Sequence, residues 1–380
     1  MNALRQAVVV GVGETEYSRE SGRTPLHLAA EACKAAIDDA GFEAAVIDGL
    51  VTYTMDNNDE LELQRCLGFP VLRWVGRSPY GGAGCTVSVQ LAAAAVMAGF
   101  AEAVIVYRAL NGRSGRRYGT PESTRAAGSG GELHYAFGLD TAAKSYAAET
   151  QGYMRRHGVT SEDLGRYAVA TRALAATNPR AMCFGKPLTL EEHQASRWIV
   201  EPWIRRYDCC LETDGGSALL ITTPERAQAS AKPPVAILAA ALAFGKGRRV
   251  AYDFYRTDEE IRAENKALVD ELERQSGIHP RDADLAMIYD AFTPGVFTAL
   301  EAVGICEEGG AKDFIAAGET GLHGAMPVNP NGGLIGEAYM HGLNNVIEAV
   351  RQLRGEGANQ VANARTSLVT GGGGLILGRA

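Results

Sequence analysis

Two short segments in the C-terminal third of the chain carry side chains that could do acid–base chemistry. One reads Ile-Tyr-Asp-Ala-Phe-Thr-Pro and places Tyr289 next to Asp290. The other reads Asn-Pro-Asn-Gly-Gly-Leu-Ile-Gly-Glu-Ala-Tyr-Met-His-Gly and places Tyr339 just before Met340 and His341. A phenol can act as general acid or base if its pKa falls from about 10 or if a relay accepts its proton. The alternative is a buried tyrosine with a hydrogen-bonded hydroxyl, and the residue types alone leave both open.

Cysteine is the other residue type that could react. Cys85 precedes an apolar run that we expect to be a helix, and a helix N-terminus can lower the pKa of a thiol. The competing interpretation is a small buried residue in the first turn. The seven cysteines are residues 33, 66, 85, 183, 209, 210 and 306. They form neither a CxxC pair nor a Cys/His ligand pattern, so we predict reduced thiols, no disulfide and no metal site.

A strand–helix rhythm along the chain must position these residues. It is typical of α/β proteins in which helices cover a largely parallel sheet. The expected strands are residues 7–12, 49–53, 103–107, 217–222, 235–241, 284–289 and 366–370. The expected helices are residues 25–40, 86–98, 140–157, 162–177, 258–276, 296–303 and 337–355. The strands at 8–12 and 235–241 head two similar halves, which indicates a weak internal repeat.

The repeat predicts two domain-like halves. We place them at residues 1–228 and 229–380, because residues 225–234 are polar and proline-rich. Residues 108–206 lack the regular rhythm, and so long an interruption is more typical of a functional insertion than of a linker.

Composition restricts the class of protein. The chain has 380 residues, 46% hydrophobic and 22% charged, as in ordinary globular enzymes. A net charge of -8 argues against nucleic acid as a main partner. The longest apolar stretch, residues 91–107, contains Gly99 and Glu102, so we expect no membrane span. The N-terminus lacks a signal-peptide pattern, which makes the cytoplasm the expected location.

Both tyrosine segments resemble the catalytic loops of the thiolase superfamily. There the first loop reads His/Asn-Asp/Glu-x-Phe, and the second reads Asn-Pro-x-Gly-Gly-x-x-x-x-Gly-His-Pro-x-Gly. Tyr289 falls where the first loop has His or Asn, and Tyr339 falls on the His of the second. The resemblance implies a five-layered αβαβα fold with two duplicated halves and an inserted loop domain at about 108–206.

The resemblance also shows what this chain lacks. Gly82 falls on the position of the family's nucleophilic cysteine, and Thr370 on that of its second thiol. Ordinary Claisen thiolysis is therefore not expected. The glycine loops remain, and Gly332, Gly333, Gly371 and Gly372 would present backbone N–H groups to a thioester oxygen. A tight turn would explain a glycine run equally well.

The pattern is similar to the steroid side-chain-cleaving aldolases, a lipid-transfer-protein-like branch of this superfamily. The matching stretches include residues 53–56, 107–115, 192–199, 208–215 and 336–342. The resemblance implies retro-aldol cleavage of a β-hydroxyacyl-CoA into a ketone or aldehyde and a short acyl-CoA such as propionyl-CoA or acetyl-CoA. The expected substrate is a steroid side-chain CoA thioester. Coenzyme A would enter as part of the substrate, with no covalently bound cofactor.

On this resemblance Tyr289 and Tyr339 are the expected acid–base pair, supported by Asp290 and His341. It also implies a homodimer core that binds a small OB-fold/zinc-ribbon protein, giving a heterotetramer. Two other functions stay open. Thiolase-type acyl transfer would use Cys85, and a non-catalytic acyl-CoA or sterol carrier would need shape without acid–base groups.

Overall fold

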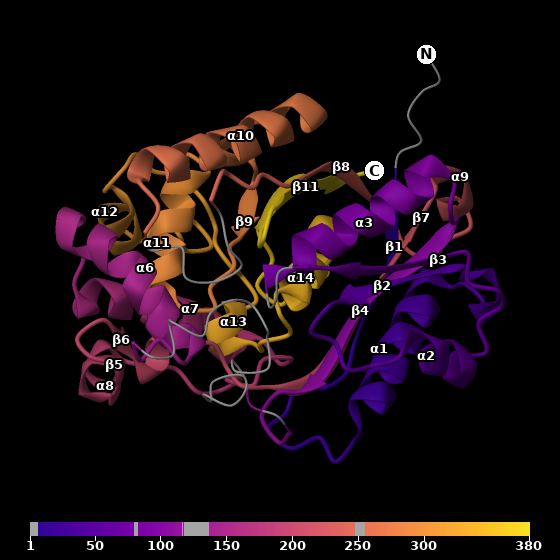
Figure 1. The fold of residues 1–380 in the computed structure, drawn as a ribbon, viewed down its shortest axis with the longest axis horizontal. Coiled ribbons are helices and arrows are strands. Elements are labelled where there is room, and N and C mark those ends of the chain that lie inside the picture. The colour runs from indigo at the N-terminus through magenta and orange to yellow at the C-terminus, as the bar shows by residue number, and fades with distance from the viewer. Residues whose placement is uncertain (1–6, 80–82, 116, 118–136, 248–254) are drawn as a thin grey trace.

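One mixed sheet of nine strands runs through the protein. In the computed structural model, the described residues are 7–79, 83–115, 117, 137–247 and 255–380 (Figure 1). The strand order is β3-β2-β4-β7-β1-β8-β11-β10-β9. The strands are β1 (Val8–Glu14), β2 (Gly49–Tyr53), β3 (Trp74–Ser78), β4 (Ala103–Asn111), β7 (Asp214–Thr222), β8 (Val235–Ala241), β9 (Leu285–Met287), β10 (Thr366–Thr370) and β11 (Gly374–Arg379).

The two halves of the sheet repeat the same pairing pattern. In the first, β1 is antiparallel to β7, β7 is antiparallel to β4, and β4 is parallel to β2. In the second, β8 is antiparallel to β11, β11 is antiparallel to β10, and β10 is parallel to β9. The duplication is therefore confirmed. The halves meet where β1 pairs with β8 over a short antiparallel stretch, so the strands form one continuous sheet rather than two separate ones.

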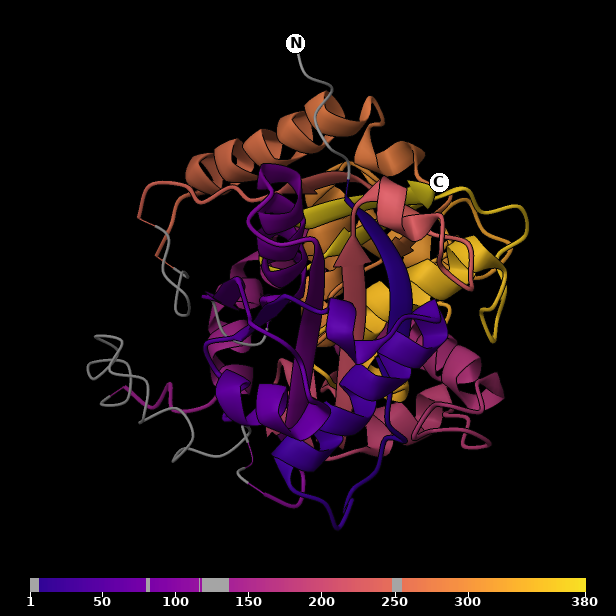
Figure 2. The ribbon, with the colours of Figure 1, turned by 90° about the vertical axis from the view of Figure 1, so that its right-hand side faces the viewer.

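Helices separate and cover the two halves in layers. They are α1 (Pro25–Ala40), α2 (Glu60–Leu67), α3 (Cys85–Ala98), α6 (Ala142–His157), α7 (Ser161–Thr177), α8 (Leu190–Ala195), α9 (Pro224–Ala227), α10 (Asp258–Ser276), α11 (Thr293–Ala302), α12 (Ala311–Ala316), α13 (Gly333–Gly336) and α14 (Leu343–Arg354). Figure 1 places α3 and α14 between α1 and α10, and Figure 2 shows α1 and α10 on opposite sides of the strands. Among the described helices, each is too short or too polar to cross a membrane.

The central layer is the largest apolar core. It combines Val89 of α3 and Val346 of α14 with strand residues of both halves, such as Val106 and Val369. Separate cores lie under α1 and under α10 and α11. The arrangement is the expected αβαβα fold, because each half of the sheet has one face on the central helices and one on outer helices.

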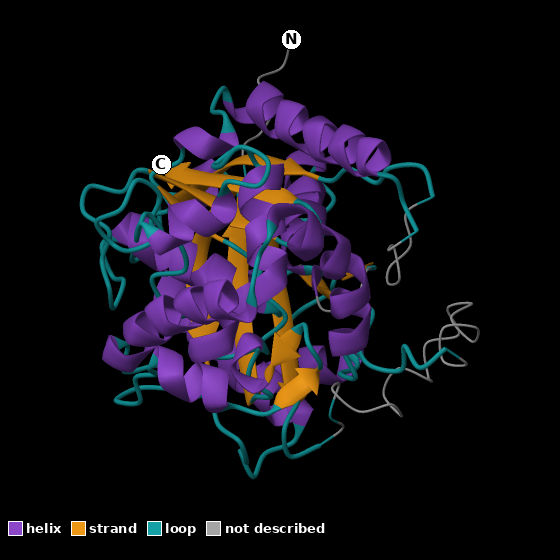
Figure 3. Ribbon diagram, turned by 90° about the vertical axis from the view of Figure 1, so that its left-hand side faces the viewer, coloured by secondary structure: helices purple, strands orange, loops and turns teal. Residues whose placement is uncertain are grey.

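The insertion forms a helical cap on the second half. Helices α6, α7 and α8 and the small ribbon of β5 (Trp198–Val200) and β6 (Ile204–Arg205) belong to it. Helix α7 packs on α12 and α13, and α6 packs on α11. This helical side faces the viewer in Figure 3. Part of the expected insertion, residues 116 and 118–136, lies outside the described residues, and the boundary between residues 228 and 229 stays a prediction.

One expected helix is wrong in its first part. The helix expected at residues 337–355 begins only at Leu343. His341 and Gly342 have φ of 54° and 79°, values that a right-handed helix cannot contain. Tyr339 therefore lies on a loop between α13 and α14. Strands β3 and β11 were not expected, since β3 is short and alternates in exposure, and β11 begins in the glycine run.

The close contact between α1 and β1 depends on glycine. A Cβ atom at Gly11 would overlap the backbone oxygen of Ala36, whereas a Cβ atom at Gly152 in α6 would meet nothing within 4 Å.

Overpacking typically costs about 1–3 kcal/mol of folding stability. We expect Gly11→Ala to lower the free energy of unfolding by about that amount. Gly152→Ala should raise it by roughly 0.5–1 kcal/mol. Urea unfolding of both variants checks this, and equal effects would contradict it.

Candidate active site

The structure brings the two predicted phenols together. Tyr289 follows β9 and precedes α11, while Tyr339 lies on the loop before α14. Their hydroxyl oxygens are 2.8 Å apart, and their rings meet at an interplanar angle of 63°. Both side chains are partly exposed, although the neighbouring Asp290 and His341 are buried. The phenols are thus the accessible members of an otherwise buried polar group.

Two threonines hold the backbones of these tyrosines. The N–H of Tyr289 donates to Oγ1 of Thr370 at 2.9 Å. The N–H of Tyr339 donates to Oγ1 of Thr213 at 3.0 Å. Thr370 occupies the position of the second thiol in the resembling family, so here that position carries a hydrogen-bond acceptor for the first tyrosine loop. Sequence reasoning noted Thr370 only as a missing thiol and did not find Thr213.

Both phenols are held in the protonated form. Burial, the largest cause, raises the pKa of Tyr289 and of Tyr339 well above the usual value of 10.0. Their shared hydrogen bond adds to this rise for Tyr289 but works against it for Tyr339. Either hydroxyl can be the donor in this bond. Two neutral phenols in contact can relay a proton without either holding a charge, provided that each gives up its own proton as it accepts another.

His341 lies against Tyr339 in a neutral form. The two ring centroids are 4.8 Å apart, at an interplanar angle of 80°. Nε of Arg108 donates to Nδ1 of His341 at 2.8 Å. Burial and then the Arg108 charge lower the pKa of His341 well below its usual value. Arg108 was not singled out from the sequence, although a single arginine inside the apolar strand β4 is a signal that could have identified it.

Asp290 supports the second loop. Its Oδ1 accepts the N–H of Leu334 at 2.7 Å, and its Oδ2 accepts the hydroxyl of Tyr167 at 3.3 Å. Burial raises the pKa of this carboxyl to about 7. Within the described residues, its side-chain hydrogen bonds thus run to α7 and α13 and to neither candidate phenol. This geometry suits orientation of the loops better than proton transfer to substrate.

The side chain of Asn329 joins the two tyrosine loops. Oδ1 of Asn329 accepts the N–H of Ile288 at 2.8 Å, and its Nδ2 donates to the Ile288 carbonyl at 2.9 Å. This pair of bonds ties the second loop to the residue before Tyr289. Asn329 has a φ of 48°, so it starts the second loop in the left-handed region. The Asn-Pro-x-Gly-Gly motif contained this residue, but the sequence did not reveal its contact.

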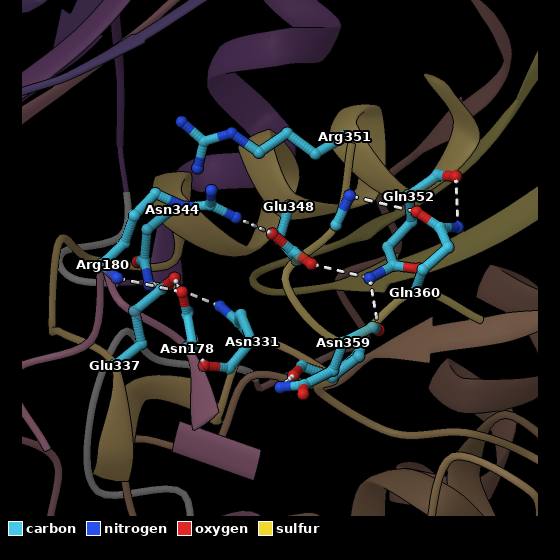
Figure 4. A network of polar contacts seen from close by, with 12 residues as sticks. Asn178, Arg180, Asn331, Glu337, Asn344, Glu348, Arg351, Gln352, Asn359 and Gln360 are labelled. Atoms are coloured by element: carbon cyan, nitrogen blue, oxygen red, sulfur yellow. Dashed lines mark hydrogen bonds and ion pairs between the residues drawn. The ribbon is translucent and has the colours of Figure 1, made fainter. Parts of the chain in front are cut away.

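A buried carboxylate anchors the residues before Tyr339. Glu337 accepts hydrogen bonds from the side-chain amides of Asn178, Asn331 and Asn344. Figure 4 shows this group continuing to Glu348 and its partners. Burial raises the pKa of Glu337 to about 8, with Glu14 and Glu348 as the next causes. These amides join α7, α13 and α14 around the loop that carries Tyr339.

Of the four glycines predicted for an oxyanion hole, Gly332 and Gly333 lie at the start of α13, and Gly371 and Gly372 lie between β10 and β11. The N–H groups of all four have partners within the protein. Those of Gly332 and Gly333 donate to the Asn329 carbonyl and to Oδ1 of Asn331. Those of Gly371 and Gly372 donate to the carbonyls of residues 373 and 83. An oxyanion role therefore requires these bonds to be exchanged for a bond to substrate, and it stays a prediction.

Cys85 lies directly behind the tyrosine loops. It is the first residue of α3 and is fully buried. A Cβ atom at Gly342 or at Gly371 would come within 2.8 Å of its sulfur. Burial raises the pKa of this thiol to about 12, although backbone N–H groups at the helix start act in the opposite direction. The thiolate needed for nucleophilic attack is therefore disfavoured. Gly82, the expected former nucleophile position, lies outside the described residues.

A family profile and two similar proteins point to the same family. A family profile for the thiolase C-terminal domain-like type matches residues 266–380. The chain is 45% identical to a "Steroid side-chain-cleaving aldolase" of Thermomonospora curvata, over 98% of this chain and 97% of that protein. It is 43% identical to a "17-hydroxy-3-oxo-4-pregnene-20-carboxyl-CoA lyase" of Mycobacterium tuberculosis, over 98% and 99%.

Solved structures agree with these relatives. The "Ltp2-ChsH2(DUF35) aldolase" superposes with a TM-score of 0.91 at 44% identity, covering 98% of each chain. Human mitochondrial 3-ketoacyl-CoA thiolase in complex with CoA superposes with a TM-score of 0.69 at 15% identity, over 99% of this chain and 98% of that one, which shows the shared fold. The chain thus belongs to the thiolase superfamily, in the branch of the steroid side-chain-cleaving aldolases.

Proposed function

We propose that this protein cleaves the Cα–Cβ bond of a β-hydroxyacyl-CoA by a retro-aldol reaction. The products are a ketone or aldehyde and a short acyl-CoA such as propionyl-CoA or acetyl-CoA. The names of the two relatives above 40% identity support a steroid side-chain thioester as substrate. The observation that carries the proposal is the 2.8 Å contact between the hydroxyls of Tyr289 and Tyr339.

The phenol pair can complete the proton balance of this reaction. One phenol oxygen takes the proton of the substrate hydroxyl, whose O–H electron pair forms the new carbonyl. The Cα–Cβ bond breaks, and its electrons delocalise into the thioester as an enolate. The other phenol gives its proton to Cα, and proton transfer across the shared hydrogen bond restores both phenols. The proton lost by oxygen thus ends on carbon, and neither phenol must ionise beforehand.

The remaining site residues have supporting roles in this proposal. Asp290 orients the second loop, and His341 packs against Tyr339. The thioester oxygen would be received by backbone N–H groups of the glycine loops, at Gly332 and Gly333 or at Gly371 and Gly372. Because the thioester itself stabilises the carbanion, the reaction needs coenzyme A only as part of the substrate.

The two other functions have weaker support. Acyl transfer through Cys85 would need a thiolate, yet burial disfavours it. A carrier of acyl-CoA or sterol would need no acid–base groups, whereas two phenols meet at an accessible position here.

We also propose a homodimer that pairs through β3. This strand is at the edge of the sheet, and apolar side chains are exposed beside it, with Val75 at 48% and Phe100 at 57%. Unpaired edge strands with apolar side chains favour pairing with another chain. A small OB-fold/zinc-ribbon protein would complete a heterotetramer, since the similar solved aldolase is named with a second component, ChsH2(DUF35).

The acid–base roles predict the behaviour of single variants. General acid–base groups contribute about 10²–10⁴-fold, so Tyr289→Phe and Tyr339→Phe should each lower kcat by roughly that factor. The double variant should lose less than the product of the two single losses in kcat, because both phenols act in one proton transfer.

Mass spectrometry of both products from a panel of β-hydroxyacyl-CoA esters, with and without the partner, measures turnover. Cys85→Ala is the control and should stay active. The covalent alternative wins if Cys85→Ala abolishes turnover while both phenylalanine variants remain active.

The raised pKa of Asp290 predicts a pH-dependent stability. A carboxyl with a folded pKa of about 7 and an ordinary unfolded value stabilises the fold below about pH 4, and this contribution is lost as pH rises through 7. Asn cannot ionise but can still accept from Leu334. The stability of Asp290→Asn relative to wild type should therefore rise between pH 4 and 8, by up to roughly 4 kcal/mol. Denaturant unfolding across this range tests it, with exposed Asp282→Asn as control. A constant difference would contradict the assignment.

The proposed dimer predicts a change in assembly. Val75→Lys puts a charge on the apolar edge of the sheet, which should shift the protein towards monomer. Light scattering coupled to size exclusion measures the mass of each species. Ile261→Lys, on the exposed face of α10, is the matched control and should leave the mass unchanged. A dimer that survives Val75→Lys at the same concentration rules out this edge as the interface.

A further inference from the structure

A buried arginine stands behind the candidate active site. The side chain of Arg108 is 1% exposed and that of Asp56 is fully buried, and Nη1 of Arg108 donates to Oδ2 of Asp56 at 2.7 Å. The same nitrogen reaches the Ala109 carbonyl at 3.3 Å, and Nε donates to Nδ1 of His341 at 2.8 Å. A buried cation is costly unless it is paired and hydrogen-bonded. Here one of its bonds goes to the imidazole next to Tyr339.

Both the backbone and the ring of His341 are constrained. Its φ of 54° lies in the left-handed region, which non-glycine residues rarely adopt. The hydroxyl of Tyr53 donates to the His341 carbonyl at 3.4 Å, and the Arg108 guanidinium lies 5.7 Å from the Tyr53 ring centroid. The imidazole is thus fixed between Arg108 on one side and the edge-on contact with Tyr339.

We propose that Arg108, anchored by Asp56, is a positioning residue that holds His341 as an uncharged imidazole against Tyr339. In a neutral imidazole one nitrogen carries the proton and the other accepts. Because Arg108 donates to Nδ1, the proton must lie on Nε2. A second proton would need the lone pair that Arg108 occupies and would put two cations in contact in a dry interior.

A neutral His341 has a kinetic consequence, which rests on the proposed reaction. An imidazolium next to Tyr339 would stabilise a phenolate there, and the phenol pair would then lack the proton that it must deliver to Cα. An unconstrained histidine changes charge near pH 6.5. The Asp56–Arg108 pair instead keeps the charge beside Tyr339 constant, so turnover should not depend on the ionisation of His341.

The groups that face His341 support this assignment. They come from several elements: Tyr53 from β2, Arg108 from β4, and Tyr339 from the same loop. Asp56 lies beyond Arg108, and Cys85 of α3 lies next to Gly342. Among the described residues of this set, Arg108 and Asp56 form an ion pair, while burial raises the pKa of the Tyr53, Tyr339 and Cys85 side chains and so favours their neutral forms.

NMR of the full-length protein, with ¹³C and ¹⁵N in its histidine rings, tests the protonation state directly. The His341 signals are assigned by their absence in His341→Gln. In the wild type we expect an unprotonated Nδ1, a protonated Nε2 and no titration between pH 5 and 8. An Nδ1–H tautomer, or a charge change within this range, overturns the proposal. This readout requires no substrate, so it stands even if the proposed reaction is wrong.

The variant Asp56→Asn/Arg108→Gln removes the pair without leaving a buried charge unpaired. Because burial remains, we expect His341 to titrate with a midpoint at or below about 6.5. Below that midpoint kcat should fall by up to tenfold per pH unit, and adding His341→Gln should remove this slope. The exposed Arg113→Gln is the control and should keep the flat wild-type profile. If His341 in the folded double variant titrates no more than in the wild type, Arg108 has only a structural role. Should the double variant not fold, the wild-type tautomer decides.

Discussion

The meeting of two phenols depends on polar side chains that are buried behind their loops. Asn329 bonds both backbone groups of Ile288, and Asp290 bonds the backbone of Leu334. Each loop therefore supplies the hydrogen-bond partner that the other lacks. Because unsatisfied polar groups in a dry interior are costly, neither loop can move far without breaking bonds in the other. This mutual dependence fixes the distance between the hydroxyls of Tyr289 and Tyr339.

The layered fold places these loops at the starts of its two central helices. Helix α3 begins at Cys85 and α14 begins at Leu343, next to the tyrosine loops. Both helices are enclosed between the halves of the sheet by one apolar core. That core packs around both helices, and Asn344 in the first turn of α14 donates to Glu337 on the loop before it. The two partly exposed phenols thus lie next to helix starts that are packed into the central core.

In the proposed reaction, a thiolase fold would act without a catalytic thiol. Cys85 is buried, and Thr370 accepts the N–H of Tyr289 where the family has a second cysteine. At this position the family's second thiol is thus replaced by a hydroxyl that positions the backbone of Tyr289. A reaction that only relocates a proton and breaks a carbon–carbon bond is compatible with this exchange, because a thioester stabilises the enolate itself.

The sequence by itself determined the layered fold, the duplication and the pair of tyrosines. Regular elements followed from the strand–helix rhythm, as for α1 at Pro25–Ala40 and α10 at Asp258–Ser276, whose approximate bounds were predicted. Only the tertiary structure decided that His341 lies on a loop, since its positive φ is held by contacts far away in sequence. It also decided which residues Arg108 contacts, and that the carboxyl of Asp290 accepts hydrogen bonds from Leu334 and Tyr167. Hydrogen bonds between residues hundreds of positions apart leave no local pattern, because they depend on where packing brings the strands and loops together.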